Sequence, residues 1–351
     1  MSIFQDGYWA TGFDMDLTAA QLFTQSAGGS ASTSVTPFSF GYAWQTGSAV
    51  CGILLNTNLT TLYAGFRVYV QGSIGTSSIL CSWYDATANG TQVSLRVTST
   101  GALQFYLGSG TGTPIGSASA AGTVVLNTWV HIQTKVLIAG SSGGSVACYV
   151  NGSGTAATST SSVTTLSTAN TWVNAFQLQG TNPTYFDDFW MLDNSGSSPF
   201  NTYLGIIQVR EEAPSANSAV TGGRNNFTPT NPTNVNYTNV GTTPATAAKY
   251  NADGTVGDWD QFAFPALPSN VASVLAVNAL ALLLLDSAGA RTVELNCSAV
   301  SGGTPTDNLG SAFTPGTTAT LYLLNNPLDP HGASWTVANA GSAELGLKVA
   351  S

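Results

Sequence analysis

The chain has 351 residues, of which 8 are Lys or Arg and 17 are Asp or Glu, so its formal net charge is −9. Charged residues make up 7% of the chain, whereas about 25% is usual for a soluble domain. So few cations cannot neutralise a phosphate backbone, and we therefore predict that the protein binds no nucleic acid. We expect a folded chain rather than a disordered one, because 43% of the residues are hydrophobic, enough to bury a core.

No segment of the sequence predicts insertion into a membrane or export. The first nine residues lack the basic and apolar regions of a signal peptide. The longest apolar stretch, residues 275–285, is much shorter than the ~20 residues of a membrane-spanning helix and predicts a buried strand. The cysteines at 51, 81, 148 and 297 are not spaced as metal ligands, so we expect small core side chains rather than disulfides.

In chain order, residues 17–23 predict a short helical turn capped by Asp16, and the elements that follow have a period of two. Apolar residues alternate with polar ones over 66–70, 92–97 and 103–107, which predicts half-buried strands with the polar residues facing solvent. Gly, Ser and Asn clusters separate these strands. Short strands joined by such turns are typical of antiparallel sandwiches and jelly rolls.

The composition changes after Arg210, where a polar, proline-containing stretch begins that predicts extended chain. Strand patterns return at residues 260–264, 271–285, 291–299, 319–324 and 343–349, with a hairpin loop at 286–290. We therefore predict an all-β protein with an N-terminal jelly-roll sandwich over residues 1–212. A linker and a smaller C-terminal β-sandwich would occupy residues 213–351.

Three segments carry a resemblance to a known family: residues 129–136 (WVHIQTKV), 146–152 (VACYVNG) and 185–191 (YFDDFWM). In this order they resemble the concanavalin A-like lectin/glucanase family, also called laminin-G-like. Asn151-Gly152 is by itself a hairpin signal, because both residues tolerate positive φ. The resemblance covers about residues 1–210 and implies a concanavalin A-like jelly roll.

Residues 6–14, 203–210 and 333–349 extend the resemblance to a structural protein of tailed bacteriophages. This implies a virion location, as a capsid decoration, head fibre or tail accessory. The implied partners are other virion proteins and further copies of the chain, and a trimer is one symmetric arrangement that would suit such a role.

Glucanases of this fold need two carboxylates on either side of the glycosidic bond. The glutamates of this chain, at 211, 212, 294 and 344, form no Glu-x-Asp pattern. Adjacent Glu211 and Glu212 would point to opposite faces of an extended chain. We therefore predict that the chain is not an enzyme and has no catalytic residues.

Asp187 and Asp188 are the strongest acidic pair and the candidate ligands for calcium, the one cofactor that the sequence suggests. We favour the simpler interpretation, in which one carboxylate faces solvent and the other caps a turn or binds loop amides. The acidic loop at 253–260 lacks the alternating Asp-x-Asp-x-Asp-Gly pattern and the terminal Glu of a calcium loop, so we interpret it as a polar loop. His131 and His331 have no Cys or His at ligand spacing, so both are expected to be structural.

Four aromatic residues fall on the polar faces of predicted strands: Tyr69, Tyr106, Trp129 and Tyr149. They are candidates for stacking on sugars or for a protein interface, although ordinary sheet aromatics have the same pattern. The main prediction is a non-enzymatic phage virion protein that acts by symmetric assembly. The alternative is a carbohydrate-binding adhesin that recognises host surface glycans.

Overall fold

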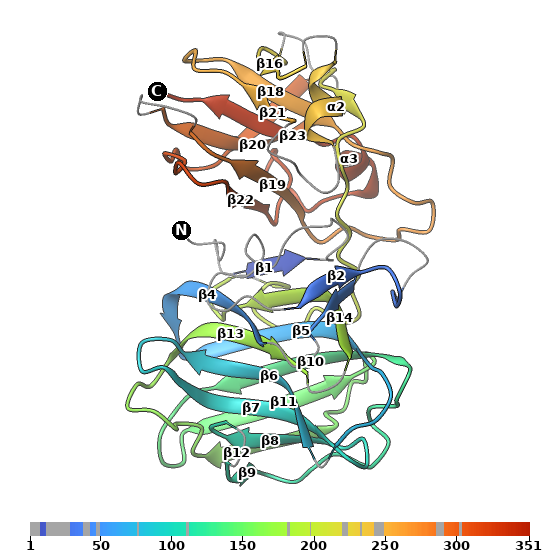
Figure 1. Cartoon of the computed structure of the whole chain (residues 1–351), viewed down its shortest axis with the longest axis vertical. Coiled ribbons are helices and arrows are strands. Elements are labelled where there is room, and N and C mark those ends of the chain that lie inside the picture. Colours follow the sequence, from blue (N-terminus) through green and yellow to red (C-terminus); the bar gives the residue numbers. More distant parts are fainter. Residues whose placement is uncertain are drawn as a thin grey trace. The chain divides into compact units, whose positions relative to one another are not determined.

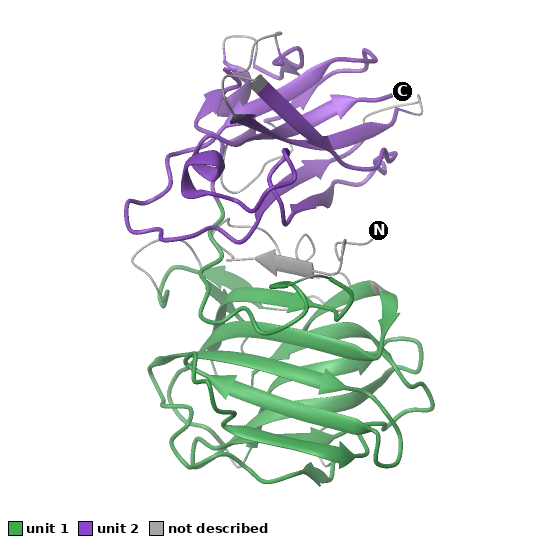
Figure 2. Cartoon of the chain, turned by 180° about the vertical axis from the view of Figure 1, so that it is seen from behind, with its two compact units in different colours: residues 1–211 green, residues 212–351 purple. Residues whose placement is uncertain are grey.

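A computed structural model describes residues 8–11, 29–37, 43–46, 50–75, 77–109, 112–180, 183–196, 198–219, 224–231, 234–241, 249–285, 291–301 and 304–351. The chain is almost entirely β (Figure 1). It divides into two compact units, residues 1–211 and 212–351, shown in different colours in Figure 2. The predicted helical turn at 17–23 and the predicted loop at 286–290 lie outside the described residues.

Two antiparallel sheets form unit 1. Their strands are β1 (Tyr8–Thr11), β2 (Ser30–Ser32), β3 (Ala43–Gln45), β4 (Val50–Leu59), β5 (Thr61–Val70), β6 (Ser77–Asp85), β7 (Gly90–Thr98), β8 (Leu103–Leu107), β9 (Pro114–Ile115), β10 (Trp129–Leu137), β11 (Gly144–Val150), β12 (Thr158–Val163), β13 (Val173–Gln179) and β14 (Thr184–Leu192). The eight-stranded sheet has the order β12-β11-β10-β5-β14-β3-β2, with β1 also paired to β14. The six-stranded sheet has the order β4-β13-β6-β7-β8-β9.

The core of unit 1 lies between the two sheets, where the apolar residues of the period-two pattern meet. Phe66 and Val68 of β5 and Leu95 of β7 are fully buried. Phe176 of the six-stranded sheet stacks on Phe189 of the eight-stranded sheet, with ring centroids 5.4 Å apart. The apolar residues of each alternating strand point to the same side, and contacts such as this one join the apolar sides of the two sheets. The predicted all-β jelly-roll sandwich is therefore confirmed.

The polar faces of these strands differ from the prediction, because several of them are not solvent-exposed. Gln92 and Ser94 on the outer face of β7 are both fully buried. The segment that follows β12 covers Gln92, whose Oε1 accepts hydrogen bonds from the backbone amides of Ser167 and Thr168 at 2.7 and 3.0 Å. A distant loop thus satisfies the polar face of β7, and sequence alternation cannot reveal such a cover.

The four cysteines are free thiols inside the two units, as predicted. Cys51, Cys81 and Cys148 belong to unit 1 and Cys297 to unit 2, and all four are buried. Burial raises the pKa of the Cys81 and Cys148 thiols well above the ordinary range and that of Cys297 to about 12. They pack as small apolar side chains.

Unit 2 contains a five-stranded sheet, two two-stranded sheets and two short helices within its described residues. Its elements are β15 (Ala216–Asn217), β16 (Thr228–Pro229), α2 (Asn236–Val240), β17 (Asn251–Ala252), β18 (Trp259–Ala263), β19 (Val277–Leu283), β20 (Val293–Ser301), β21 (Thr304–Leu309), β22 (Thr320–Asn326), α3 (Val337–Gly341) and β23 (Glu344–Val349). The five-stranded sheet has the order β15-β18-β23-β20-β21, while β19 pairs with β22 and β16 with β17.

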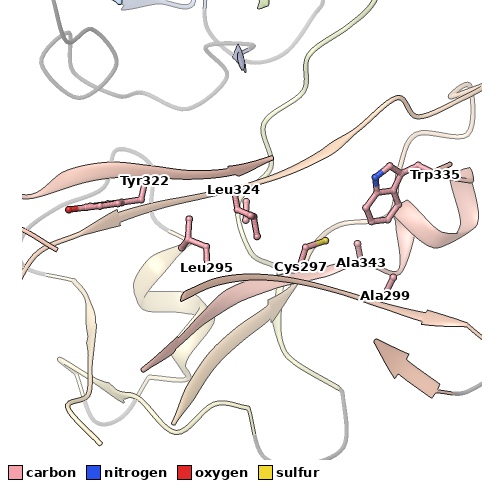
Figure 3. Close-up of a cluster of buried hydrophobic side chains, with 8 residues drawn as sticks. Leu295, Cys297, Ala299, Tyr322, Leu324, Trp335 and Ala343 are labelled. Atoms are coloured by element: carbon pink, nitrogen blue, oxygen red, sulfur yellow. The ribbon is translucent and has the colours of Figure 1, made fainter. Parts of the chain in front are cut away.

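The hydrophobic core of unit 2 lies between the β19–β22 pair and the five-stranded sheet (Figure 3). Leu295 and Cys297 of β20 face Tyr322 and Leu324 of β22, and Trp335 closes one end. The Trp335 indole nitrogen donates a hydrogen bond to the Asn326 carbonyl at 2.8 Å. The predicted C-terminal β-sandwich is thus present.

The polar stretch after residue 211 is not only extended chain, because it forms β15, β16 and α2. Its order comes from hydrogen bonds between side chains. Buried Asp260 of β18 accepts hydrogen bonds from the amides of Asn236 and Asn251, both at 2.7 Å. Side-chain amides therefore satisfy the buried carboxylate at this end of unit 2.

Among the described residues, no helix has the length and the apolar character that crossing a membrane requires.

Candidate functional site

The outer face of the eight-stranded sheet brings together most of the residues that the sequence analysis selected. Tyr69 lies on β5, Trp129 on β10, Tyr149 on β11, and Asp187 on β14. In the strand register, Trp129 and Tyr185 lie on either side of Tyr69. This face is the candidate functional site.

Three rings form an aromatic row, which we define as Tyr69, Trp129 and Tyr185. The ring centroid of Tyr69 is 5.6 Å from that of Trp129 and 6.0 Å from that of Tyr185. Tyr69 and Trp129 are half-buried, whereas Tyr185 is 5% exposed and its hydroxyl hydrogen-bonds the Gln71 side chain at 3.2 Å. Tyr185 is not among the aromatic residues predicted from the sequence. Only its pairing with Tyr69 reveals its place in the row.

Tyr106 is separated from the other three aromatic candidates, because it lies on β8 of the six-stranded sheet. Its ring stacks against Arg96, whose guanidinium carbon is 4.4 Å from the ring centroid. Tyr149 stays on the candidate face but is engaged by Tyr203, at a centroid distance of 4.5 Å. The four candidates therefore do not form one site.

Asp187 and Asp188 lie at a β-bulge in β14 that redirects the chain. Asp188 has φ of 49°, in the left-handed region that Asp tolerates better than most residues. Its Oδ2 lies 2.5 Å from Nε of Arg67, and its Oδ1 accepts a hydrogen bond from the Val209 amide at 2.7 Å. Burial raises the pKa of Asp188, while Val209 and Arg67 act in the opposite direction.

Both carboxylates are buried, so the expectation that one of them faces solvent is wrong. Asp187 is 3% exposed and Asp188 is 1% exposed. Asp188 does bind a backbone amide, as the simpler interpretation predicted, and Oδ1 of Asp187 accepts from the Asp188 amide at 2.7 Å. In the described part of the chain, no three His, Cys, Asp or Glu side chains gather as a metal would require.

His131 of β10 lies beside Arg67 on the same face and is 1% exposed. Neither ring nitrogen has a hydrogen-bond partner among the described residues. Burial and the neighbouring Arg67 charge lower the pKa of His131 to about 4, so the ring is neutral at pH 7. The structural role expected for His131 stays a prediction.

Residues 203–209, which we call the crossing segment, run over the middle of the face. The Gly205 amide donates to Oε1 of Gln133 at 2.9 Å, and Tyr203 packs against Tyr63 at a centroid distance of 5.3 Å. The side chain of Ile206 lies close enough to the turn at Gly152 that a Cβ there would approach it to 2.9 Å. The crossing segment, held at its end by the hydrogen bond from Val209 to Asp188, therefore covers the centre of the face. The aromatic row lies next to this covered area.

The other weak candidates of the sequence lie in unit 2. The backbone amide of His331 donates to Oδ1 of Asp329 at 3.0 Å within a turn. Oδ1 of Asp253 accepts from the Thr255 amide at 2.6 Å. Both arrangements are ordinary turns in which a carboxylate satisfies nearby amides.

No family model matches the chain, and no curated protein matches it significantly. Among solved structures, it is similar to an endo-β-1,4-glucuronan lyase from the fungus Trichoderma reesei, with a TM-score of 0.38 and 11% identity over 54% of this chain and 95% of that one. Alginate lyase Aly36B matches with a TM-score of 0.33 and 13% identity over 53% and 97% of the chains. The carbohydrate-binding module CBM66 from Bacillus subtilis matches with a TM-score of 0.32 and 10% identity over 55% and 99%.

These matches contradict the main functional prediction, a phage structural protein, because they are two lyases and a carbohydrate-binding module. The two lyases also contradict the prediction that the chain is not an enzyme. Virion location and self-association are tested by none of them and stay predictions. Because every TM-score here is below 0.5, the function of this chain is argued below from its own residues.

Proposed function

We propose that unit 1 binds carbohydrate on the outer face of its eight-stranded sheet. The observation that carries this proposal is the aromatic row. The three rings come from three neighbouring strands, and the centroid of the central Tyr69 ring is 5.6 Å and 6.0 Å from those of its two neighbours. Two of the three residues are half-buried rather than enclosed in the core.

Such a row suits a sugar for a physical reason. One face of a pyranose ring carries C–H groups, which pack on an aromatic face, while the hydroxyls at the ring edge need hydrogen-bond partners. Rings held on adjacent strands are rigid, so little conformational entropy is lost when a ligand stacks on them. Tyr69 and Trp129 are held in this way on the adjacent strands β5 and β10.

Two loops with hydrogen-bonding groups lie beside the row. The loops at residues 71–75 and 125–128 follow β5 and precede β10, and Gln71 and Asn127 in them are exposed. These two loops are linked by a hydrogen bond from the Gly72 amide to Oδ1 of Asn127 at 3.2 Å. Neutral amides of this kind can exchange hydrogen bonds with sugar hydroxyls without the desolvation of a charge.

The family assignment to concanavalin A-like lectins is part of this proposal. It is supported by the Asn151-Gly152 hairpin, where the two residues have φ of 50° and 70°. It is also supported by the place of Trp129 and Asp187 on one sheet.

The proposal is tested on a glycan microarray, followed by calorimetry with the best-bound glycan. Trp129→Ala and Tyr69→Ala should each weaken binding about tenfold, the loss of one stacking contact. Tyr106→Ala is the matched control, because it removes a strand aromatic from the other sheet and should leave affinity unchanged. Cleavage of the glycan is measured in the same samples as an increase in reducing ends, so that binding and processing are distinguished.

Two results would contradict the proposal. One is a wild-type protein that binds no glycan on the array. The other is a bound glycan whose affinity falls equally in Tyr106→Ala and in Trp129→Ala while both variants keep the thermal stability of the wild type.

A further inference from the structure

We infer that the same sheet has a second subsite, specific for an oxyanion group of a saccharide, in a groove on β10, β11 and β12. This inference deepens the proposed function and rests on it. The groove, which we call the lysine groove, has a volume of ≈ 470 Å³. It is lined by Lys135, Ser145, Val146, Ala147, Ser159, Thr160 and Ser161.

The strand register explains why a groove forms here. Lys135 pairs with Ala147 and Ala147 with Ser159, so the three residues form one row across three strands. In the next row, Ser145 pairs with Ser161. Ala147 and Ser145 have small side chains, which leave space beside the longer Lys135 side chain among the lining residues. A volume of this size is within the range of about 300–1,000 Å³ that is usual for ligand sites.

Lys135 is the charged group of the groove. Its Nζ lies 5.1 Å from the centroid of the Tyr63 ring, a cation–π distance that orients the ammonium group, and the residue as a whole is half-buried. No carboxylate of the described residues forms an ion pair with it. In contrast, Arg67 of the same sheet is paired with Asp188. An ammonium group that has no ion-pair partner among the described residues is positioned to bind an external anion.

Hydroxyl groups provide the remaining contacts. The side chains of Ser145, Ser159 and Ser161 make no hydrogen bond to any residue that the structure describes. Each hydroxyl can both donate and accept. A cation beside several hydroxyls suits a sugar that carries a carboxylate or sulfate. The chain has 8 Lys and Arg among 351 residues, so cations are rare on its surface. A groove that contains one of them would favour a negatively charged saccharide over a neutral one.

The lysine groove is separate from the aromatic row. Lys135 follows Trp129 by six positions in β10, a distance of about 20 Å along a strand. Tyr203 of the crossing segment lies against Tyr63 and Tyr149, next to the groove. One monosaccharide therefore cannot occupy both places, and the two can be tested independently.

The test compares oligogalacturonate with the same oligosaccharide after reduction of its carboxylates, and with a sulfated neutral oligosaccharide. Calorimetry is carried out on the full chain at low and high salt. Lys135→Ala should weaken oligogalacturonate binding about tenfold at low salt, less at high salt, and should leave the carboxyl-reduced ligand unaffected. The sulfated ligand distinguishes the source of the anion: equal loss assigns the groove to oxyanions in general, and no loss restricts it to carboxylates.

Two further variants complete the test. Lys348→Ala is the matched control, because Lys348 also lies over an aromatic ring, with its Nζ 5.3 Å from the Trp259 centroid in unit 2. It should bind like the wild type. Ala147→Leu places a larger side chain in the groove without removing a charge, and it should weaken oligogalacturonate binding as much as Lys135→Ala does.

The outcomes separate this inference from the proposed function. Acidic-glycan binding that Lys135→Ala leaves unchanged would overturn the inference, as would an equal loss for the acidic and the carboxyl-reduced ligand. Sensitivity to Trp129→Ala would still support the proposed function in that case. Sensitivity to Lys135→Ala without sensitivity to Trp129→Ala would support the groove and refute the aromatic row. A wild-type protein that binds none of the three ligands overturns the inference.

Discussion

His131 should make unit 1 lose stability in acid. Its pKa is lowered to about 4 in the folded chain, whereas an unperturbed histidine has 6.5. The unfolded chain therefore binds the proton more readily between these two values. Stability is fully present above pH 6.5 and falls as the pH decreases to 4. The difference between the two pKa values corresponds to a loss of about 3 kcal/mol from this residue alone.

The measurement compares wild type with His131→Gln, which keeps a polar side chain but cannot take up a proton in this range. Hydrogen exchange in β10 peptides, corrected for intrinsic rates, gives the free energy of opening at pH 7 and pH 4. The wild type should lose about 3 kcal/mol more than the variant between the two conditions. His331→Gln, at an exposed turn in unit 2, is the control. Equal acid losses in wild type and His131→Gln would refute the reasoning.

Three further predictions concern stability. The pKa of Asp260 is raised to about 6 by burial, so unit 2 should become less stable as the pH rises from about 4 to 6, and Asp260→Asn should remove this dependence in urea unfolding. Gly65→Ala would place a Cβ 2.2 Å from the buried Trp190 ring and should cost about 1–3 kcal/mol, with a changed near-UV spectrum. Arg224 donates to both carboxylate oxygens of Asp307 at 2.6 and 2.8 Å. A double-mutant cycle that combines Asp307→Asn with a substitution of Arg224 should therefore give a coupling free energy of unfolding of about 1–2 kcal/mol.

Alternation in the sequence was enough to predict the strands around residues 66–70, 92–97 and 103–107 and the apolar side of each. Phe66 and Val68 are buried while Arg67 and Tyr69 between them are only partly so, because side chains on a strand point to opposite faces. The Asn151-Gly152 turn was equally local, since positive φ at both residues depends on the dipeptide itself.

The candidate site depends on pairings between distant segments, which alternation does not contain. Tyr106 and Tyr69 have the same local pattern, and only the order of strands places them on different sheets. The bulge that turns Asp188 toward Arg67, 121 residues away, is a property of register rather than of the Asp-Asp dipeptide. The cover provided by the crossing segment likewise depends on where the chain returns after β14.

The buried thiols give each unit its own chemical reporter. A thiol with a raised pKa and no access to solvent reacts with an alkylating reagent only after its surroundings open. Cys297 is the only cysteine in residues 212–351, and the other three belong to residues 1–211. Alkylation mapped by mass spectrometry at increasing temperature would therefore record two separate melting curves from one unlabelled, unmutated sample.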